Sequence, residues 1–522
     1  MLSIAFTGAR GQSVSLSLRS FGCRSRKFST EPQTLAQRLS GHHLINGQLV
    51  SSSAKFPVHS PATGALVGHA AKGDASTIDS AVSSSKAAQK KWAERPVKER
   101  AALVAQCAQV LRAHSEELAK LTSLETGKAL RTESRVEAGV CSDAFTFFAG
   151  LGSEIKGEVI PWNPNSITFT QRYPMGVVAA VIPWNAPLML FSLKCAPALV
   201  CGNSVVLKSA EEAPFGVLRV VELLNTVLPP GLVNCISGFG PDCGGPLVAH
   251  RDVAKISFTG SVDTGKIIYK AAADKLAPIT LELGGKSPML VMADADIDRA
   301  VDGAIVGSLK VSVRFTRQGQ SCSASSRIFV HSSVHDQFVE KLKQKVNEMK
   351  MGNPLDDATD IGTIISRSQF DKVKKYIELG KGLPGVQAHE CSQLPTDSAM
   401  SSGFFVRPVI FTGITNDTIL AQEEIFGPVC CILKWDDFDK VLEEANCSSF
   451  GLAASVWTKD LKMALKATQK LEAGIVQVNQ NAVLQPNLPI GGWKESGLGV
   501  EGSLDSMLQA FTQSKTISIN MN

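Results

Sequence analysis

The sequence predicts an α/β protein built around a parallel β-sheet. Between residues 176 and 292, short apolar runs typical of strands alternate with helical patterns of about 10–15 residues. This alternation indicates βαβ units, whose strands lie parallel. The chain has 522 residues, of which 44% are apolar and 19% charged. That balance is typical of a globular protein, and the length allows two or three domains.

The elements before this run differ in pattern. A short strand region comes first, followed by residues 71–127, which are rich in Ala, Lys and Glu at helical spacing. A β-hairpin is expected over 154–172, because Ile and Val alternate on one arm and Ile, Thr and Phe on the other.

The alternating run itself predicts both element types in order. Strands are expected at 176–182, 204–207, 233–237, 255–259, 279–283 and 289–292. Helices are expected at 188–200, at 214–228, shortly before residue 255, and from about residue 264. A second alternating region covers residues 322–458, and 515–519 resembles an edge strand, which suggests oligomerisation.

Residues 1–30 have the composition of a mitochondrial transit peptide. They hold five of the 53 Lys and Arg residues, seven serines and no acid. This predicts a transit peptide at 1–28 and a mitochondrial matrix location, against the alternative of a disordered tail with accidental composition. The remaining 48 cations match 48 acids. A nucleic-acid or membrane-surface partner is therefore not expected.

Two further features argue against a membrane span and a metal site. The uncharged segment 175–193 reaches bilayer length, but Pro183, Asn185 and Pro187 interrupt it. A strand, a turn and a buried helix fit it better. The twelve cysteines include no CxxC pair, so no metal is expected.

Two predicted strand ends carry residues suited to a dinucleotide. Parallel sheets bind ligands at the carboxyl ends of their strands. Lys208 and Glu211 follow one strand and suit a ribose and its phosphate; the glutamate favours NAD over NADP. Gly260 and Ser261 follow another, with Gly265 at the start of a helix whose N-terminus favours phosphate. No complete GxGxxG motif is present, and each turn could instead be purely structural.

Two residues are candidates for the chemistry. Glu282 lies in an apolar strand, where burial raises a carboxyl pKa and suits a general base. The alternative is an exposed glutamate paired with Lys286. Cys322 would be a strong nucleophile as a thiolate, and the alternative is one more buried cysteine. Three arginines near it in sequence are expected to favour the thiolate: Arg314, Arg317 and Arg327.

Together these residues resemble the aldehyde dehydrogenase superfamily, from about residue 45 to the C-terminus. The motifs are Pro-Trp-Asn-Ala-Pro at 183–187, Leu-Glu-Leu-Gly-Gly-Lys-Ser-Pro at 281–288, Gly-Gln-Ser-Cys at 319–322, Glu-Glu-Ile-Phe-Gly-Pro at 423–428 and Gly-Gly-Trp-Lys-Glu-Ser-Gly at 491–497. Shorter matches lie at 45–47, 61–64 and 125–128. The family usually has Asn at the position of Arg317, which puts the positioning of the Cys322 loop in question.

The resemblance implies roles for matched residues. Cys322 would attack the aldehyde to give a thiohemiacetal, and the Asn185 amide with the Cys322 backbone N–H would form the oxyanion hole. Glu282 would activate the water that hydrolyses the thioester. Trp184, Lys208, Glu211 and Ser261 would contact the adenosine half of NAD, and Glu424 and Phe426 the nicotinamide half. Glu501 matches a proton-relaying glutamate of some members.

The resemblance also implies an architecture and a substrate class. The expected fold is aldehyde dehydrogenase-like, with a Rossmann-type cofactor domain (35–155 and 175–290), an α/β catalytic domain (291–495) and a β oligomerisation element (156–174 and 510–522). A homodimer or homotetramer is expected. Residues matching the pocket wall are small or aliphatic: Ala186, Leu190, Leu193, Ser321, Ser323, Leu484 and Ile490. They favour a medium-size aliphatic aldehyde over betaine aldehyde, which needs an aromatic cage.

Alternatives stay open on the sequence alone. One is a semialdehyde dehydrogenase, either succinate-type or CoA-acylating. Another is a non-catalytic scaffold on the same fold. NADP remains an alternative cofactor.

Overall fold

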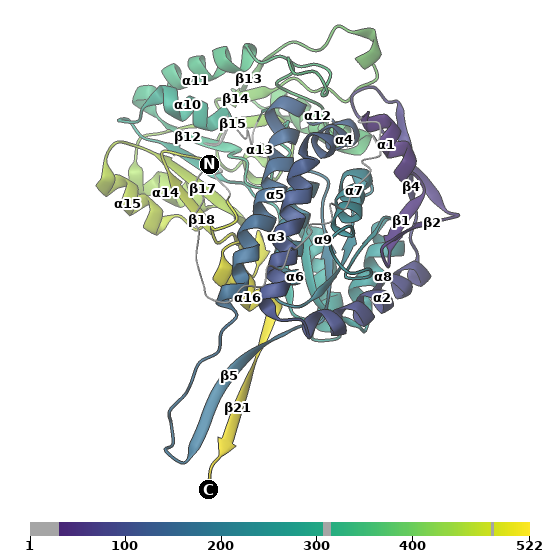
Figure 1. Ribbon diagram of the computed structural model, residues 1–522. Helices are drawn as coiled ribbons and strands as arrows, with labels where there is room; N and C mark the ends of the chain where they lie inside the picture. Colours follow the sequence, from purple (N-terminus) through teal and green to yellow (C-terminus); the bar gives the residue numbers. More distant parts are fainter. Residues whose placement is uncertain (1–30, 306–314, 482–484) are drawn as a thin grey trace, which may run out of the picture.

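A computed structural model describes residues 31–305, 315–481 and 485–522. The predicted transit peptide, Arg314 and Leu484 lie outside these ranges. Two large sheets organise the described chain (Figure 1). The described helices include none that is long and apolar enough to cross a bilayer.

The first sheet has eight strands among the described residues, in the order β2-β1-β8-β7-β6-β9-β10-β20. Strands β6 to β10 run parallel to one another, whereas β1, β2 and β20 add antiparallel edges. Their bounds are β1 His42–Ile45, β2 Gln48–Ser51, β6 Val177–Val181, β7 Ser204–Lys208, β8 Val233–Ile236, β9 Val253–Thr259, β10 Ile279–Glu282 and β20 Gly497–Leu498. From β6 the chain first adds β7 and β8 on one side, then β9 and β10 on the other. This reversal places a topological switch point at β6, where parallel sheets bind ligands.

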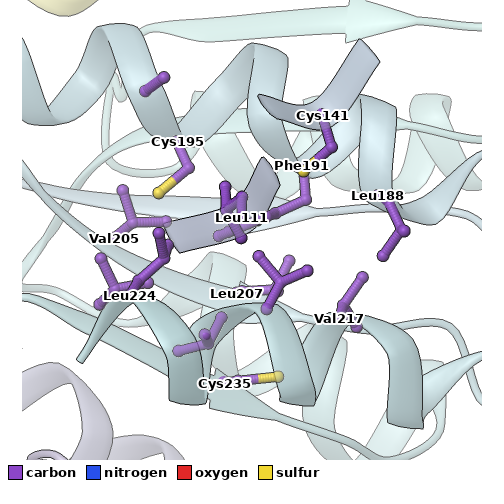
Figure 2. Close-up of a cluster of buried hydrophobic side chains, with 14 of the residues drawn as sticks. Leu111, Cys141, Leu188, Phe191, Cys195, Val205, Leu207, Val217, Leu224 and Cys235 are labelled. Atoms are coloured by element: carbon purple, nitrogen blue, oxygen red, sulfur yellow. The ribbon is translucent and has the colours of Figure 1, made fainter. Parts of the chain in front are cut away.

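Helices cover this sheet because their apolar stripes need a partner surface. They are α1 Pro32–Leu39, α2 Ala75–Ala93, α3 Val97–Ala113, α4 Ser115–Thr126, η1 Leu130–Ser134, α5 Arg135–Ala149, α6 Pro187–Val200, α7 Pro214–Leu224, α8 Gly245–Ala249, α9 Val262–Ala273 and α16 Leu504–Phe511, with short turns η2 Gly150–Glu154 and η3 Gly240–Gly244. Figure 2 shows one part of the core, in which Leu188, Phe191 and Cys195 of α6, Val205 and Leu207 of β7, and Val217 and Leu224 of α7 pack together. Helix α7 ends at Leu224, four residues before its predicted end, and residues 225–228 form turns instead.

The second sheet has seven described strands in the order β13-β14-β15-β12-β11-β17-β18, all parallel except β13. They are β11 Pro288–Val291, β12 Arg327–His331, β13 Gln387–Glu390, β14 Val409–Thr412, β15 Val429–Trp435, β17 Ala453–Trp457 and β18 Ile475–Val478. Its helices are α10 Ile297–Ile305, α11 Ser332–Asn347, α12 Arg367–Lys381, η4 Ser398–Met400, α13 Ile419–Gln422, α14 Phe438–Asn446 and α15 Leu461–Lys470. Strand β11 closes the predicted alternating run, yet it pairs with β12 and β17 of this second sheet. The chain therefore crosses between the sheets within residues 283–287.

Three two-stranded sheets complete the part of the fold that the structure describes. Two are small: β3 Lys55–His59 with β4 Leu66–Ala71, and β16 Phe450–Gly451 with β19 Trp493–Lys494. In the third, β5 Ser166–Pro174 pairs antiparallel with the C-terminal β21 Thr512–Asn520 and extends away from the body (Figure 1).

The pairing of β5 with the C-terminal strand agrees with the β element of residues 156–174 and 510–522 that the family resemblance implied. The predicted hairpin over 154–172 is only half right, because its first arm forms no regular strand. That arm still follows β5 over a short stretch, with the isolated bridge Val159 to Phe169 and the backbone bonds from the Ile160 N–H to the Thr168 carbonyl and from the Thr170 N–H to the Glu158 carbonyl. The long nine-residue register of β5 is with β21.

Candidate active site

Four neighbouring strands of the first sheet deliver the predicted residues to one edge. Lys208 is the last residue of β7, Glu282 is the last of β10, and Ser261 follows β9. Strand β6 lies between β7 and β9 and leads into the turn that carries Trp184 and Asn185. Parallel strands end at a common edge, so residues far apart in sequence meet there.

Two strand ends form the side suited to the adenosine half of a dinucleotide. Lys208 Nζ donates to the Glu211 carboxylate at 3.1 Å. Ser261 caps helix α9, its hydroxyl accepting from the Thr264 N–H at 3.3 Å. Gly265 lies one turn into α9, and a Cβ there would overlap the side chain of Leu283. The glycine thus lets the helix pack closely against the strand end, with its N-terminus open toward a phosphate.

Two glycines after Glu282 let residues from the region of the second sheet come close to the end of β10. A Cβ on Gly284 would collide with the Glu424 carboxylate, and one on Gly285 would collide with the backbone carbonyl of Cys322. The Gly285 N–H also donates to Glu424 Oε1 at 2.9 Å. Only glycine permits this approach, which brings Glu282, Glu424 and Cys322 into one cluster.

Aromatic rings close the same cluster. The rings of Trp184 and Phe426 meet edge to face, with centroids 5.4 Å apart. A small pocket beside them is lined by Gly285, Ser321, Glu424 and Phe426, among others.

Cys322 follows a tight turn held by backbone geometry. Gln318 and Gly319 both adopt positive φ, 55° and 65°. A Cβ on Gly319 would overlap the carbonyl of Gly427. The side chain of Gln320 fixes the turn to a neighbouring loop, donating to the Thr363 carbonyl at 3.1 Å and accepting from the Ile365 N–H at 3.0 Å.

Asn185 lies against this turn. Its side-chain amide donates to the Gln320 carbonyl at 3.2 Å, two residues before the cysteine. Its own backbone carbonyl accepts from Lys128 Nζ at 3.2 Å. The amide is therefore buried and anchored beside Cys322, as an oxyanion-hole donor requires.

The electrostatics around the thiol differ from the prediction. Burial, then the carboxyls of Glu424 and Glu282, raises the pKa of Cys322 to about 12, and Arg317 opposes this more weakly. Arg317 is itself paired with Glu133 at 2.7 Å, which offsets its charge. Arg327 does not face the thiol: it donates to the carbonyls of Lys286, Glu444 and Ala445. Arg317 favours the thiolate as expected, but burial and the two carboxyls outweigh it; Arg327 is directed elsewhere, and Arg314 lies outside the described residues.

Glu282 is a buried carboxyl, only 7% exposed, which overturns the alternative of an exposed glutamate. Its Oε1 has no hydrogen-bond partner among the described residues. Burial, then the charge of Glu501, raises the pKa of Glu282 well above its usual range, while Lys194 opposes the shift. A carboxylate whose pKa is raised by burial is a stronger base than a free one, which suits a group that accepts protons during a reaction.

A buried triad lies next to Glu282. Glu501 Oε1 accepts from Lys194 Nζ at 2.6 Å and from the Ser257 hydroxyl at 2.8 Å, and Lys194 Nζ reaches Ser257 Oγ at 3.1 Å. The sequence analysis missed Lys194 and Ser257. The signal for Lys194 was a lysine inside an otherwise apolar helix, since a buried lysine requires a partner.

The cluster fits a dinucleotide on its own chemistry. Lys208 and the α9 N-terminus supply positive ends for phosphate, Glu211 and Glu424 supply carboxylates for ribose hydroxyls, and glycines replace side chains where the backbone must come close.

Comparisons with known proteins agree with this geometry. Residues 49–517 match the sequence profile of the aldehyde dehydrogenase family. A mitochondrial aldehyde dehydrogenase, family 2 member B4, from Arabidopsis thaliana is 39% identical over 97% of this chain and 93% of its own. A betaine aldehyde dehydrogenase from Mesorhizobium japonicum is 38% identical over 91% of this chain and 96% of its own.

A solved structure shows the same arrangement of the chain. The NAD+ complex of the aldehyde dehydrogenase from Bacillus cereus superimposes with a TM-score of 0.87 and 36% identity, covering 92% of this chain and 97% of its own. The match of nearly the whole sequence, together with this fold, shows that the chain belongs to the aldehyde dehydrogenase family.

Proposed function

We propose that Cys322, Asn185 and Glu282 carry out the oxidation of an aldehyde to a carboxylic acid in this protein. The observation that carries the proposal is that the three residues come together. The Asn185 side-chain amide hydrogen-bonds to the turn that leads to Cys322, and Gly285, just after Glu282, packs closely against the Cys322 carbonyl. A nucleophile, an oxyanion donor and a base thus share one buried edge.

The first half of the reaction forms a bond to sulfur. Cys322 Sγ, once deprotonated, adds to the aldehyde carbon to give a thiohemiacetal, and the Asn185 amide with the Cys322 N–H stabilises the oxyanion. Because burial and two carboxyls raise the thiol pKa to about 12, loss of its proton needs an acceptor, and we assign that role to Glu282, a buried carboxyl whose charge acts on the thiol.

NAD supplies the hydride acceptor when bound, and collapse of the oxyanion leaves a thioester on Cys322. We place its adenosine half against Trp184, Lys208, Glu211 and the turn of Gly260, Ser261 and Gly265, and its nicotinamide half against Glu424 and Phe426. The carboxylate of Glu211 disfavours the 2′-phosphate of NADP.

The second half is hydrolysis. Glu282 takes a proton from water, which attacks the thioester and releases the acid. The triad of Lys194, Ser257 and Glu501 lies next to Glu282 and offers a path for that proton.

Four finer assignments belong to the proposal: the substrate class, the location, the assembly and the domain division. The substrate is a medium-size aliphatic aldehyde, since Ala186, Leu193, Ser321 and Ser323 are small or aliphatic and buried. The protein works in the mitochondrial matrix, supported by the leader composition and by mitochondrial relatives. It assembles as a homodimer or homotetramer through the β5–β21 arm, which exposes Val159, Trp162 and Ile519.

The domain division is proposed in the same terms: a cofactor domain of 35–155 and 175–290, a catalytic domain of 291–495, and an oligomerisation element of 156–174 and 510–522. The first two follow the two sheets, apart from strand β11 and strand β20 at their borders.

The test compares Cys322→Ala with Cys447→Ala, which removes an exposed cysteine away from the cluster. Both are assayed on a panel of aliphatic aldehydes, benzaldehyde, betaine aldehyde and succinic semialdehyde with NAD and NADP, reading absorbance of the reduced nicotinamide. We expect Cys322→Ala to lose all turnover and Cys447→Ala to match the parent enzyme. Retained turnover in Cys322→Ala would exclude the proposed nucleophile, and a preference for betaine aldehyde would exclude the substrate class.

A further inference from the structure

A second set of buried charges lies behind the catalytic turn. It consists of two ion pairs, Glu133 with Arg317 and Lys128 with Glu137. All four side chains are almost fully buried, with at most 7% exposed. Buried ion pairs contribute little net stability compared with apolar packing, so their presence calls for another explanation.

Glu133 binds the turn that ends at the nucleophile. Its Oε2 accepts from Arg317 Nε at 2.7 Å, and its Oε1 accepts from the hydroxyl of Thr316. One carboxylate thus ties down two consecutive residues of the turn. Glu133 lies in η1, a π-helical turn in front of α5, and such turns occur frequently at functional sites.

The second pair, Lys128 with Glu137, contacts Asn185, the proposed oxyanion donor. Lys128 Nζ bonds both to Glu137 and to the backbone carbonyl of Asn185. Glu137 Oε1 accepts from the Leu188 N–H at 2.8 Å, at the start of α6. Asn185 and the Cys322 turn are therefore both fixed by groups within residues 128–137, which span the loop before η1, η1 itself and the start of α5.

Arg317 is also a departure from the residue that is usual in the family. Asparagine carries no charge, so it forms no ion pair with Glu133. The charged groups that act most strongly on Cys322 are Glu424, Glu282 and Arg317. Those that act on Arg317 include Glu133, Glu137, Lys128 and Cys322. Among the described groups of largest effect on the thiol, Arg317 carries the positive charge.

We propose that Arg317 and Glu133 are positioning residues for Cys322: the pair fixes the 316–320 turn against η1 and places a balanced pair of charges beside the thiol. The inference rests on the proposed role of Cys322 as nucleophile. It predicts that breaking the pair lowers kcat, because the turn is no longer held, and shifts the pH midpoint at which the thiol ionises. The direction of the midpoint shift depends on which partner is removed.

Two variants break the same pair in opposite electrical senses. Arg317→Met leaves the negative Glu133 uncompensated, so the pH midpoint for alkylation of Cys322 by iodoacetamide moves up by about one unit. Glu133→Gln leaves the positive Arg317 uncompensated, so that midpoint moves down. Both variants lower kcat about tenfold or more with little change in the KM for aldehyde, because the turn is no longer held.

Alkylation is followed by mass spectrometry of the Cys322 peptide, with the exposed Cys447 as internal standard. The control is Arg219→Met, which removes the partly buried ion pairs of Arg219 with Glu117 at 2.6 Å, between α7 and α4, and with Glu222 at 2.6 Å. It leaves the Cys322 midpoint and kcat unchanged. If Arg317→Met does not fold, Arg317→Lys keeps the charge but loses the Nε contact, and it lowers kcat without moving the midpoint.

The inference is overturned if the two midpoints move in the same direction, if kcat stays within twofold of the parent in both variants, or if Arg219→Met causes an equal loss. Failure of the proposed function is a separate result, since retained turnover in Cys322→Ala would expose it while the alkylation midpoints still report on the Arg317 pair.

Discussion

Removal of the Asn185 side chain tests the oxyanion hole with little disturbance of the fold. The Asn185→Ala substitution deletes the amide that donates to the Gln320 carbonyl at 3.2 Å. The bond from Lys128 goes to the Asn185 backbone carbonyl, so alanine keeps it. The loop around the cysteine therefore loses one hydrogen bond, which contributes about 1 kcal/mol to stability.

The catalytic loss is larger than the structural one. A preorganised donor in a water-excluded site stabilises the developing oxyanion by about 3 kcal/mol, which corresponds to a factor of roughly 10² in kcat. The expected result is a fall of that size in kcat/KM with NAD, measured by absorbance of the reduced nicotinamide. The thermal midpoint should fall by less than about 2 °C.

Alkylation separates this loss from damage to the nucleophile. Displacement of iodide from iodoacetamide by Cys322 develops no oxyanion on the substrate carbon, so Asn185→Ala should be alkylated at nearly the parent rate. Asn185→Asp, of the same shape but negatively charged, should be slower still in turnover. A loss of less than fivefold in kcat/KM for Asn185→Ala, or an equal loss in alkylation, would refute the assignment of the donor.

Three more outcomes follow from the buried carboxyls. Glu282→Gln should slow the first burst of reduced nicotinamide and lower steady-state turnover by about 10² or more, because Glu282 is proposed to accept protons from both the thiol and water; unchanged turnover contradicts its role. Glu501→Gln leaves Lys194 buried without its ion pair and should lower the free energy of unfolding by about 3–5 kcal/mol, measured by urea denaturation. Burial raises the pKa of Glu125 to about 8, so the folded carboxyl stays protonated where the unfolded one ionises, and stability should fall as pH rises from about 4.5 to 8. In Glu125→Gln the thermal midpoint should therefore depend less on pH between about 4.5 and 8. An unchanged pH dependence would contradict the raised pKa of Glu125.

Local patterns in the sequence determined most of the secondary structure. The apolar runs at 204–207 and 255–259 are strands β7 and β9, and the prolines at 183 and 187 separate β6 from α6 as expected. Strand and helix periodicity and chain breakers act within a few residues, so a linear reading detects them. The first arm of the predicted hairpin pairs with β5 only over residues 158–160, whereas the nine-residue partner of β5 is the distant β21, which a strand pattern alone does not specify.

The candidate residues could be identified from the motifs in which they lie, but the burial and charge around them could not. Cys322 and Glu282 could be singled out from the chain, whereas the raised thiol pKa and the neutralisation of Arg317 by Glu133 could not. Glu133 lies 184 positions from Arg317 and belongs to no motif identified in the sequence. Burial and charge balance depend on what surrounds a group in three dimensions.

The sequence by itself determined the α/β class and the order of strands and helices, and its family motifs pointed to Cys322, Glu282 and Asn185 as the candidate nucleophile, base and oxyanion donor. Only the tertiary structure decided that β11 leaves the first sheet for the second, that Lys194 and Glu501 form a buried pair, and that buried ion pairs contact both Asn185 and the turn before Cys322. The physical reason is that periodicity and turn chemistry are short-range, whereas sheet order, desolvation and ion pairing join segments that are distant along the chain.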